Sequence, residues 1–290
     1  MTYSTRLPIF TLLAGLAALL ATHATAQTAP QAPEMSASPA PKPLWEVGGA
    51  VFAASQPAYP GAATRTSRAL ALPFVIYRGE FLRAEQNNVG LRAIKTPRYE
   101  LDVGFAGSLG SNSKDVPARL GMQDLGSLIE FGPRLKINIG EVTNGRSSLW
   151  VELPVRGVFD LSNSFANRGV NFEPQLSFAL PLPGGWVGGG SVATSFGSQK
   201  FADTFYGVTN AQATATRPAY TAKSGLITTR ATLAASKRVT QDLRVLGFAR
   251  LDSVGGSANR SSALVEKTNG LSVGLGLTYT LGRSSSMVNE

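Results

Sequence analysis

The side chains with the greatest capacity for chemistry are acidic and basic residues that recur at alternate positions in three consecutive segments. Two carboxylates that neighbouring strands bring together would be the minimum for glycosidase-type acid–base catalysis. A wall of paired charges is also typical of the water-filled or plugged interior of a membrane barrel. No third group completes a catalytic site, so we interpret the set as a structural or pore-lining network. Its members are Glu130, Arg134, Lys136, Glu152, Arg156 and Glu173.

The composition excludes most other kinds of active site. The chain has 290 residues, no cysteine and a single histidine, His23, which falls in a segment that we expect the mature protein to lose. Without histidine or cysteine there is no catalytic triad, thiol nucleophile or zinc site. A barrel protease or phospholipase would likewise lack its base. We therefore predict a non-enzymatic protein with no metal and no cofactor.

The first 26 residues have the layout of a secretory signal peptide. Arg6 precedes an apolar run from Leu7 to Ala21, and the small-residue motif Ala24-Thr25-Ala26 follows, which predicts cleavage after Ala26. The alternative is an uncleaved anchor helix, but 15 apolar residues are fewer than the ~20 that span a bilayer. Residues 27–43 are rich in proline and alanine, which predicts a periplasmic lead-in without a fold of its own.

From residue 44 onward, apolar and polar residues alternate in long runs. In residues 270–281, for example, Leu271, Val273 and Leu275 are interleaved with serine and glycine. Such runs exceed the usual strand length of about 5–6 residues and match the ~9–11 that a tilted strand needs to cross a bilayer. A soluble sandwich alternates too. The predicted signal peptide and the full charges on the polar face favour the membrane.

These runs predict an all-β fold, a transmembrane antiparallel up-and-down β-barrel over residues 44–282, with residues 283–290 as a loose polar tail. The connections alternate between short and long, as periplasmic turns and external loops do in bacterial outer-membrane barrels. Because the alternation fails in residues 80–86, ten strands are the alternative to twelve. The twelve predicted strands span residues 44–54, 67–77, 80–86, 88–95, 98–109, 125–139, 148–160, 169–181, 184–197, 223–237, 241–253 and 270–282.

The longest predicted external loop, residues 198–222, is rich in aromatic side chains. Loops beyond about 12–15 residues are usually either functional or disordered. This loop could form a constriction or an external contact surface, and the alternative is a solvated loop with local aromatic packing. Most external loops carry one net positive charge, which suits the anionic headgroups of outer-membrane lipids and lipopolysaccharide. The aromatic side chains are Phe201, Phe205, Tyr206 and Tyr220.

The basic character of the chain does not indicate nucleic-acid binding. Lysine and arginine outnumber aspartate and glutamate by 27 to 18. They are spread one or two per predicted strand, without the basic stripe or aromatic platform of a nucleic-acid-binding surface. We therefore predict no nucleic-acid partner.

Several short motifs resemble the MipA/OmpV family of outer-membrane proteins, the MltA-interacting protein type. They occur in order over residues 44–281, so the resemblance covers nearly the whole predicted mature chain. The chain departs from members that finish on an aromatic residue, because Leu281 holds that place. The motifs are Tyr59-Pro60-Gly61, Leu72-Pro73-Phe74 with Tyr77-Arg78, Asp124-Leu125-Gly126, Phe205-Tyr206-Gly207-Val208-Thr209 and Gly274-Leu275-Gly276-Leu277-Thr278-Tyr279.

The resemblance implies a non-enzymatic scaffold in the outer membrane of a Gram-negative cell. Family members look like scaffolds that join a murein-degrading lytic transglycosylase to a bifunctional penicillin-binding protein in peptidoglycan remodelling. Two other functions stay open, a narrow channel for small polar solutes and a surface adhesin that acts through residues 198–222 and 254–269. A scaffold would act through the periplasmic end, whereas a channel would act through the charges of the lumen.

Overall fold

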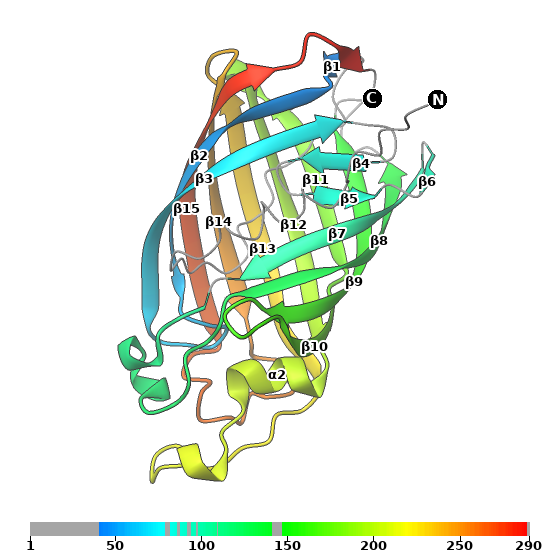
Figure 1. Cartoon of the computed structure of the whole chain (residues 1–290). Coiled ribbons are helices and arrows are strands. Elements are labelled where there is room, and N and C mark those ends of the chain that lie inside the picture. The colour runs from blue at the N-terminus through cyan, green and yellow to red at the C-terminus, as the bar shows by residue number, and fades with distance from the viewer. Residues whose placement is uncertain are drawn as a thin grey trace, which may run out of the picture.

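The computed structural model describes residues 41–78, 82–85, 88–91, 94–96, 98–108, 110–140 and 147–288. The predicted signal peptide and most of the predicted lead-in, residues 27–43, lie outside them. No helix within these ranges is long and apolar enough to cross a membrane. Figure 1 shows long tilted strands that surround a central axis, with the long loops and helix α2 (Gln199–Tyr206) at one end.

One antiparallel sheet of 14 strands makes up the wall in the described part of the chain. Most strands that are neighbours in sequence pair with one another, and the first and last long strands also pair, Leu275 opposite Ala53. The strands are β2 (Trp45–Pro57), β3 (Arg65–Arg78), β4 (Leu82–Glu85), β5 (Asn88–Leu91), β6 (Ile94–Lys95), β7 (Tyr99–Ser108), β8 (Leu128–Gly140), β9 (Ser148–Asp160), β10 (Ala166–Phe172), β11 (Gln175–Leu182), β12 (Trp186–Gly197), β13 (Gly225–Arg238), β14 (Leu243–Ser253) and β15 (Asn269–Arg283).

The predicted fold class, an all-β antiparallel barrel, is confirmed, with two differences in its strands. The predicted strand 169–181 is divided into β10 and β11, which both pair with β9 and β12 on either side of Glu173 and Pro174. Proline lacks the N–H that a ladder needs, which explains the interruption. Of the predicted strands 80–86 and 88–95, the described residues form the short strands β4, β5 and β6, and residues 80, 81, 86, 92 and 93 lie outside the described ranges.

The alternation in β15 separates a lipid-facing surface from the interior. Leu275 is 72% exposed and Leu277 is 49% exposed, whereas Ser272, which lies between Leu271 and Val273 and points to the other face, is fully buried. Gly276 lies under the ring of Phe52. A methyl group added at this glycine would come within 2.6 Å of the ring, so a larger residue would not fit without a shift. Apolar side chains outside and small or polar side chains inside are typical of a transmembrane barrel.

The two ends of the described chain meet at the end of the barrel opposite α2. Strand β1 (Lys42–Pro43) pairs with β16 (Met287–Val288), and the Leu44 amide donates a hydrogen bond of 2.8 Å to the Ser286 carbonyl. Long loops face outward in bacterial barrels, so this end is the periplasmic one. The expectation of a loose tail over residues 283–290 is wrong for Met287–Val288, because backbone hydrogen bonds tie this segment to the other end of the chain.

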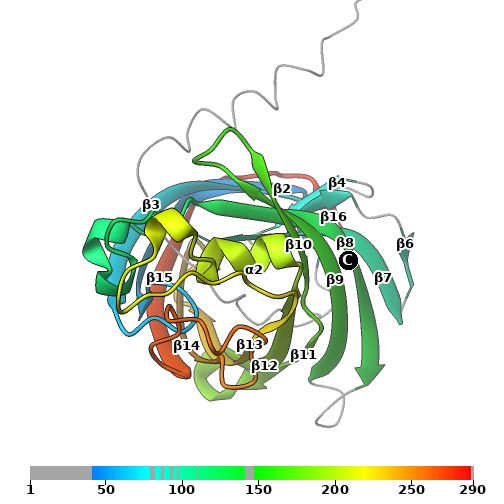
Figure 2. The same ribbon diagram turned by 90° about the horizontal axis from the view of Figure 1, so that it is seen from below.

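The long loops carry the remaining helical turns. Beside α2 in residues 198–224 lies η5 (Asn210–Gln212), and residues 110–127 contain η2 (Ser113–Asp115) and η3 (Pro117–Arg119). At the periplasmic end, η4 (Pro183–Gly185) connects β11 to β12, and Gly184 has a φ of 72° that favours glycine. Figure 2, viewed from the loop end, shows α2 over one part of the ring of strands, beside β10.

Candidate functional site

One cluster of charges on the inner wall is centred on Arg134 of β8. Its guanidinium donates to both carboxylate oxygens of Asp102, at 2.9 Å from Nε and 2.5 Å from Nη2. Its Nη1 also lies 3.2 Å from Glu152 Oε2. Lys136 Nζ lies 3.7 Å from the same Asp102, and the Ser177 hydroxyl donates to Glu152 at 3.3 Å. Two cations therefore face two carboxylates across β7, β8 and β9.

A second cluster begins at Arg156 of β9, nearer the external end. Arg156 Nε lies 3.0 Å from Glu130 Oε2, and its Nη2 contacts Glu173. The Asn171 amide donates to the same Glu130 oxygen, Oε2, at 3.0 Å. The Ser195 hydroxyl in turn donates to Asn171 Oδ1 at 2.8 Å. This cluster therefore links β8, β9, β10 and β12.

The second cluster continues across the barrel through residues of β13 and β14. Arg230 Nη1 lies 2.5 Å from Glu173 Oε1, and its Nε lies 3.1 Å from Asp252 Oδ1. Arg250 Nε lies 2.9 Å from Asp252 Oδ2, and its Nη2 donates to the Ser272 hydroxyl at 3.4 Å. Acidic and basic groups alternate along the whole path from Glu130 to Arg250. We call the six charged residues of this path the charge ring: Glu130, Arg156, Glu173, Arg230, Asp252 and Arg250.

The arrangement of these charges supports a structural role and not acid–base catalysis. Every carboxylate in both clusters contacts an arginine, and Arg134, Arg156 and Arg250 are less than a tenth exposed. A buried charge is costly unless it is paired and hydrogen-bonded, so the members hold one another in place. A general acid would instead need a carboxyl in an environment that favours its protonated form. The clusters therefore resemble a cross-link between strands more than an acid–base pair.

The structure brings the six predicted charges together in two groups. Arg134, Lys136 and Glu152 join Asp102, and Glu130, Arg156 and Glu173 join the charge ring. Sequence reasoning missed four members, although each sits at a polar position of an alternating run, which is the signal that could have found them. Whether these charges serve a function beyond structure stays a prediction. The missed members are Asp102, Arg230, Arg250 and Asp252.

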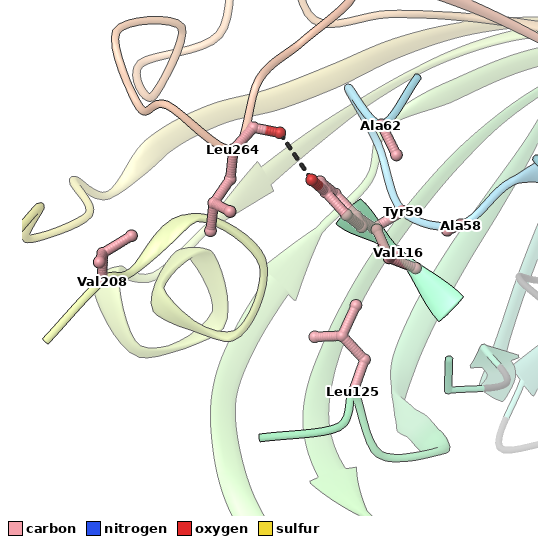
Figure 3. Close-up of a cluster of buried hydrophobic side chains, with 7 residues drawn as sticks. All are labelled: Ala58, Tyr59, Ala62, Val116, Leu125, Val208 and Leu264. Atoms are coloured by element: carbon pink, nitrogen blue, oxygen red, sulfur yellow. Dashed lines mark hydrogen bonds between the residues drawn. The ribbon is translucent and has the colours of Figure 1, made fainter. Parts of the chain in front are cut away.

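Four external loops pack together above the charge ring, and we call residues 58–64, 110–127, 198–224 and 254–268 the cap. One apolar cluster, shown in Figure 3, joins Tyr59, Val116, Val208 and Leu264 from all four loops. The Tyr59 hydroxyl, in a side chain 1% exposed, donates to the Leu264 carbonyl at 2.8 Å. Burial raises the pKa of Tyr59, which keeps its hydroxyl a donor.

The predicted loop aromatics lie inside the cap. Phe201 is 5% exposed and Tyr206 is fully buried, and both pack on Leu128 and Val158 of the barrel wall. Phe205 and Tyr220 are partly buried and pack against both apolar clusters of the cap. The loop is therefore packed on the barrel and is not simply solvated. Phe201 and Tyr206 are buried, so they do not form an external contact surface.

Two arginines tie the loops of the cap to one another. Arg119 is 4% exposed, donates to the Phe205 carbonyl at 3.2 Å, and lies over the Tyr59 ring at 5.7 Å. Burial lowers the pKa of Arg119. Arg217 donates from Nη1 to the carbonyls of Ala118 and Leu120, at 2.9 and 3.0 Å. Backbone carbonyls thus take the place of counter-ions, and residues 110–127 are fixed to residues 198–224.

A small cavity separates the cap from the charge ring. Its volume is about 30 Å³, and Glu130, Ser195 and Arg230 line it from the wall while Phe201 and Phe205 line it from α2. A cavity of this size has room for a few water molecules at most. Side chains of α2 and of the charge ring therefore face each other across a narrow gap at this point. The described residues contain no group of three acidic, histidine or cysteine side chains that could hold a metal ion.

A family model described as "MltA-interacting protein MipA" matches residues 47–281. Similar solved structures include a KdgM porin, with TM-score 0.39 and 8% identity over 80% of this chain and 99% of that one. The COG4313 outer membrane channel from Pseudomonas putida F1 has TM-score 0.43 and 12% identity, over 86% of this chain and 99% of that one. No curated protein matches the sequence.

Proposed function

Since the chain belongs to the family of the MltA-interacting protein MipA, we propose that this outer-membrane barrel is a scaffold for peptidoglycan remodelling. The resemblance found in the sequence motifs is confirmed by the match over residues 47–281. In this proposal the barrel holds a lytic transglycosylase, and through it a murein synthase, at the inner surface of the outer membrane. The protein itself carries out no reaction, and its leader is removed after Ala26.

The observation that carries the proposal is the packed cap at the external end of the barrel. In the cap, α2 packs against the barrel wall, and Arg156 and Arg230 beneath it are paired with carboxylates. A channel needs a continuous path, and the loop aromatics Phe201 and Tyr206, which an adhesin could have used for contact, are buried. Both alternatives are less well supported than a protein that acts through its other end.

The periplasmic end offers an ordered surface with exposed apolar side chains. Met287 of β16 is 53% exposed, and Val239 in the turn between β13 and β14 is 51% exposed. Nearby, Arg283 contacts Asp242, which fixes this turn to the end of β15. Exposed apolar groups with a polar rim are typical of protein–protein contact sites. We propose that the partner binds here.

The test is a binding measurement with the purified lytic transglycosylase MltA and the mature barrel in nanodiscs. We expect saturable binding that Val239→Asp with Met287→Asp weakens by about tenfold, because a charge is then buried without a partner. Leu120→Asp is the matched control, since Leu120 is 55% exposed on the cap. The proposal is wrong if no binding occurs, or if the cap variant weakens binding as much as the periplasmic variant.

A further inference from the structure

One edge of β3 lacks ladder partners over most of its length among the residues that the structure describes. On one side β3 pairs with β2 along its whole length, from Arg65 to Tyr77. On its other side, within the described ranges, ladder partners exist only for Tyr77 and Arg78, opposite Ala84 and Arg83 of β4. Figure 1 shows β3 and β7 bordering this side of the barrel, where β4 and β5 are short.

The hairpin of β4 and β5 is too short to cover this edge. Tyr77 lies opposite Ala84, and Glu85 already lies opposite Asn88 of the returning strand. β4 ends at Glu85, one residue beyond Ala84, and β5 pairs with β4. The edge from Arg65 to Pro73 therefore lies beyond its reach. Unpaired strand edges are avoided in a bilayer unless they border a cavity or another molecule.

The inner face of β3 beside this edge is apolar and accessible. Leu72 lies opposite Ala50, which is buried on the inner wall, so Leu72 also points inward. Despite that orientation, Leu72 is 37% exposed, so there is open space next to it inside the barrel. Leu70 lies two residues away on the same face, opposite the inward-facing Phe52. An apolar surface thus runs along the interior next to the unpaired edge.

The side chain of Arg68 lies at the external end of this apolar surface. Arg68 shares the inward face of β3 with Leu70 and Leu72, and it is half-buried. In the described part of the chain Arg68 has no hydrogen-bond acceptor and no carboxylate partner, unlike Arg134, Arg156, Arg230 and Arg250. A half-buried guanidinium gains from an anionic partner, and a carboxylate matches its donor geometry.

We propose that β3 forms a binding site for a single-chain anionic amphiphile such as a fatty acid. The carboxylate binds Arg68, the acyl chain lies over Leu70 and Leu72, and the unpaired edge of β3 connects the site to the membrane. The cap closes the external mouth, so the ligand enters laterally from the lipid. This site goes beyond the scaffold function, because neither the lumen nor β3 takes part in that function.

The test is photolabelling of the mature barrel in nanodiscs of neutral lipid. The probe is dodecanoic acid with a diazirine in its chain, used at alkaline pH where the carboxylic acid is ionised. Its methyl ester serves as the uncharged comparison, and peptide mass spectrometry locates the label. We expect labelling concentrated on residues 65–76, stronger for the acid than for the ester.

Variants separate the charge from the apolar surface. Arg68→Ala should reduce labelling by the acid about tenfold, the effect of losing a charged hydrogen bond, and leave labelling by the ester unchanged. Arg68→Lys should retain most of the labelling. Leu72→Trp should reduce labelling by both probes, because the larger ring fills the site. Arg238→Ala, a matched control at an exposed arginine of β13, should change nothing.

Three results would overturn the proposal, provided that each variant keeps the heat-modifiable gel migration of a folded barrel. The first is label spread evenly over lipid-facing residues such as Leu275. The second is unchanged labelling by the acid in Arg68→Ala. The third is labelling of β3 only after deletion of residues 27–40, since the lead-in of the chain itself would then be the occupant.

Discussion

The two sides of the barrel interior are built on opposite principles. From β7 to β14 the inner wall consists of charges that pair across strands, such as Arg156 with Glu130 at 3.0 Å. On β2, β3 and β15 glycines and apolar side chains predominate, such as Gly276 beneath Phe52, and the charges are fewer, such as the pair of Arg78 with Glu46 at 2.8 Å. The charged side derives its order from ion pairs that cannot be separated cheaply. The apolar side derives its order from close packing, and it is the side on which β3 is left unpaired.

Removing one charge from the charge ring should have the largest effect on stability. Arg156→Ala leaves Glu130 buried with only the Asn171 amide as a partner, while Glu173 keeps Arg230. We expect a loss of about 3–5 kcal/mol in the free energy of unfolding. Urea titration of the barrel in lipid vesicles, followed by heat-modifiable migration, measures it. The double variant Glu130→Gln with Arg156→Met should be much less destabilised; equal losses would show that the charges do not act as a pair.

Overfilling the apolar side should have the next largest effect. Gly276→Val places methyl groups where the Phe52 ring lies, 2.6 Å from the position of an added Cβ. We expect a loss of about 1–3 kcal/mol, the usual cost of overpacking. The same urea titration applies. Adding Phe52→Ala should restore most of the loss, and no recovery in that double variant would rule out the proposed contact.

Loosening the cap should cost less than either change in the barrel wall. Tyr59→Phe removes the hydroxyl that donates to the Leu264 carbonyl at 2.8 Å and leaves that carbonyl without this donor. We expect a loss of about 1–2 kcal/mol, confined to the loops. Hydrogen exchange of residues 254–268 should increase while exchange in β13 and β14 stays unchanged. Faster exchange throughout the barrel would contradict an independently packed cap.

The smallest effect should come from a charge pair at the periplasmic end. Arg283 and Asp242 are 36% and 41% exposed, so water screens their attraction. Arg283→Ala should therefore change the free energy of unfolding by less than about 1 kcal/mol. It is the matched control for Arg156→Ala, because both variants remove one arginine from an ion pair. Equal losses in the two would mean that burial does not distinguish the charge ring.

The sequence predicts the parts of this structure that depend on local periodicity. The alternation around Leu271 and Leu275 identifies β15 and its lipid-facing side, because side chains of a strand alternate between its two faces. The same rule places Glu130, Arg156 and Glu173 inside the barrel. It also applies to Arg230 and Asp252, which only the pairing between distant strands identifies as members of the charge ring.

The cap and the edge of β3 could not be predicted in this way. The cap brings Tyr59 and Leu264 together across most of the chain, and no local pattern encodes contacts of such separation. A long loop with Phe201 and Phe205 reads equally well as a solvated loop and as a packed one. The short β4 and β5 likewise depend on how β3 and β7 are held by the rest of the sheet.

The central claim, that the barrel is closed at its external end and acts from its periplasmic end, is tested most directly by single-channel conductance. The refolded protein is inserted into a planar bilayer after heat-modifiable migration has verified its fold, with Arg156→Ala as the lumen variant. Our account predicts an electrically silent wild-type barrel. Stable conductance steps in the wild type, with an ion selectivity that shifts in Arg156→Ala, would contradict it and identify the charge ring as the lining of a channel.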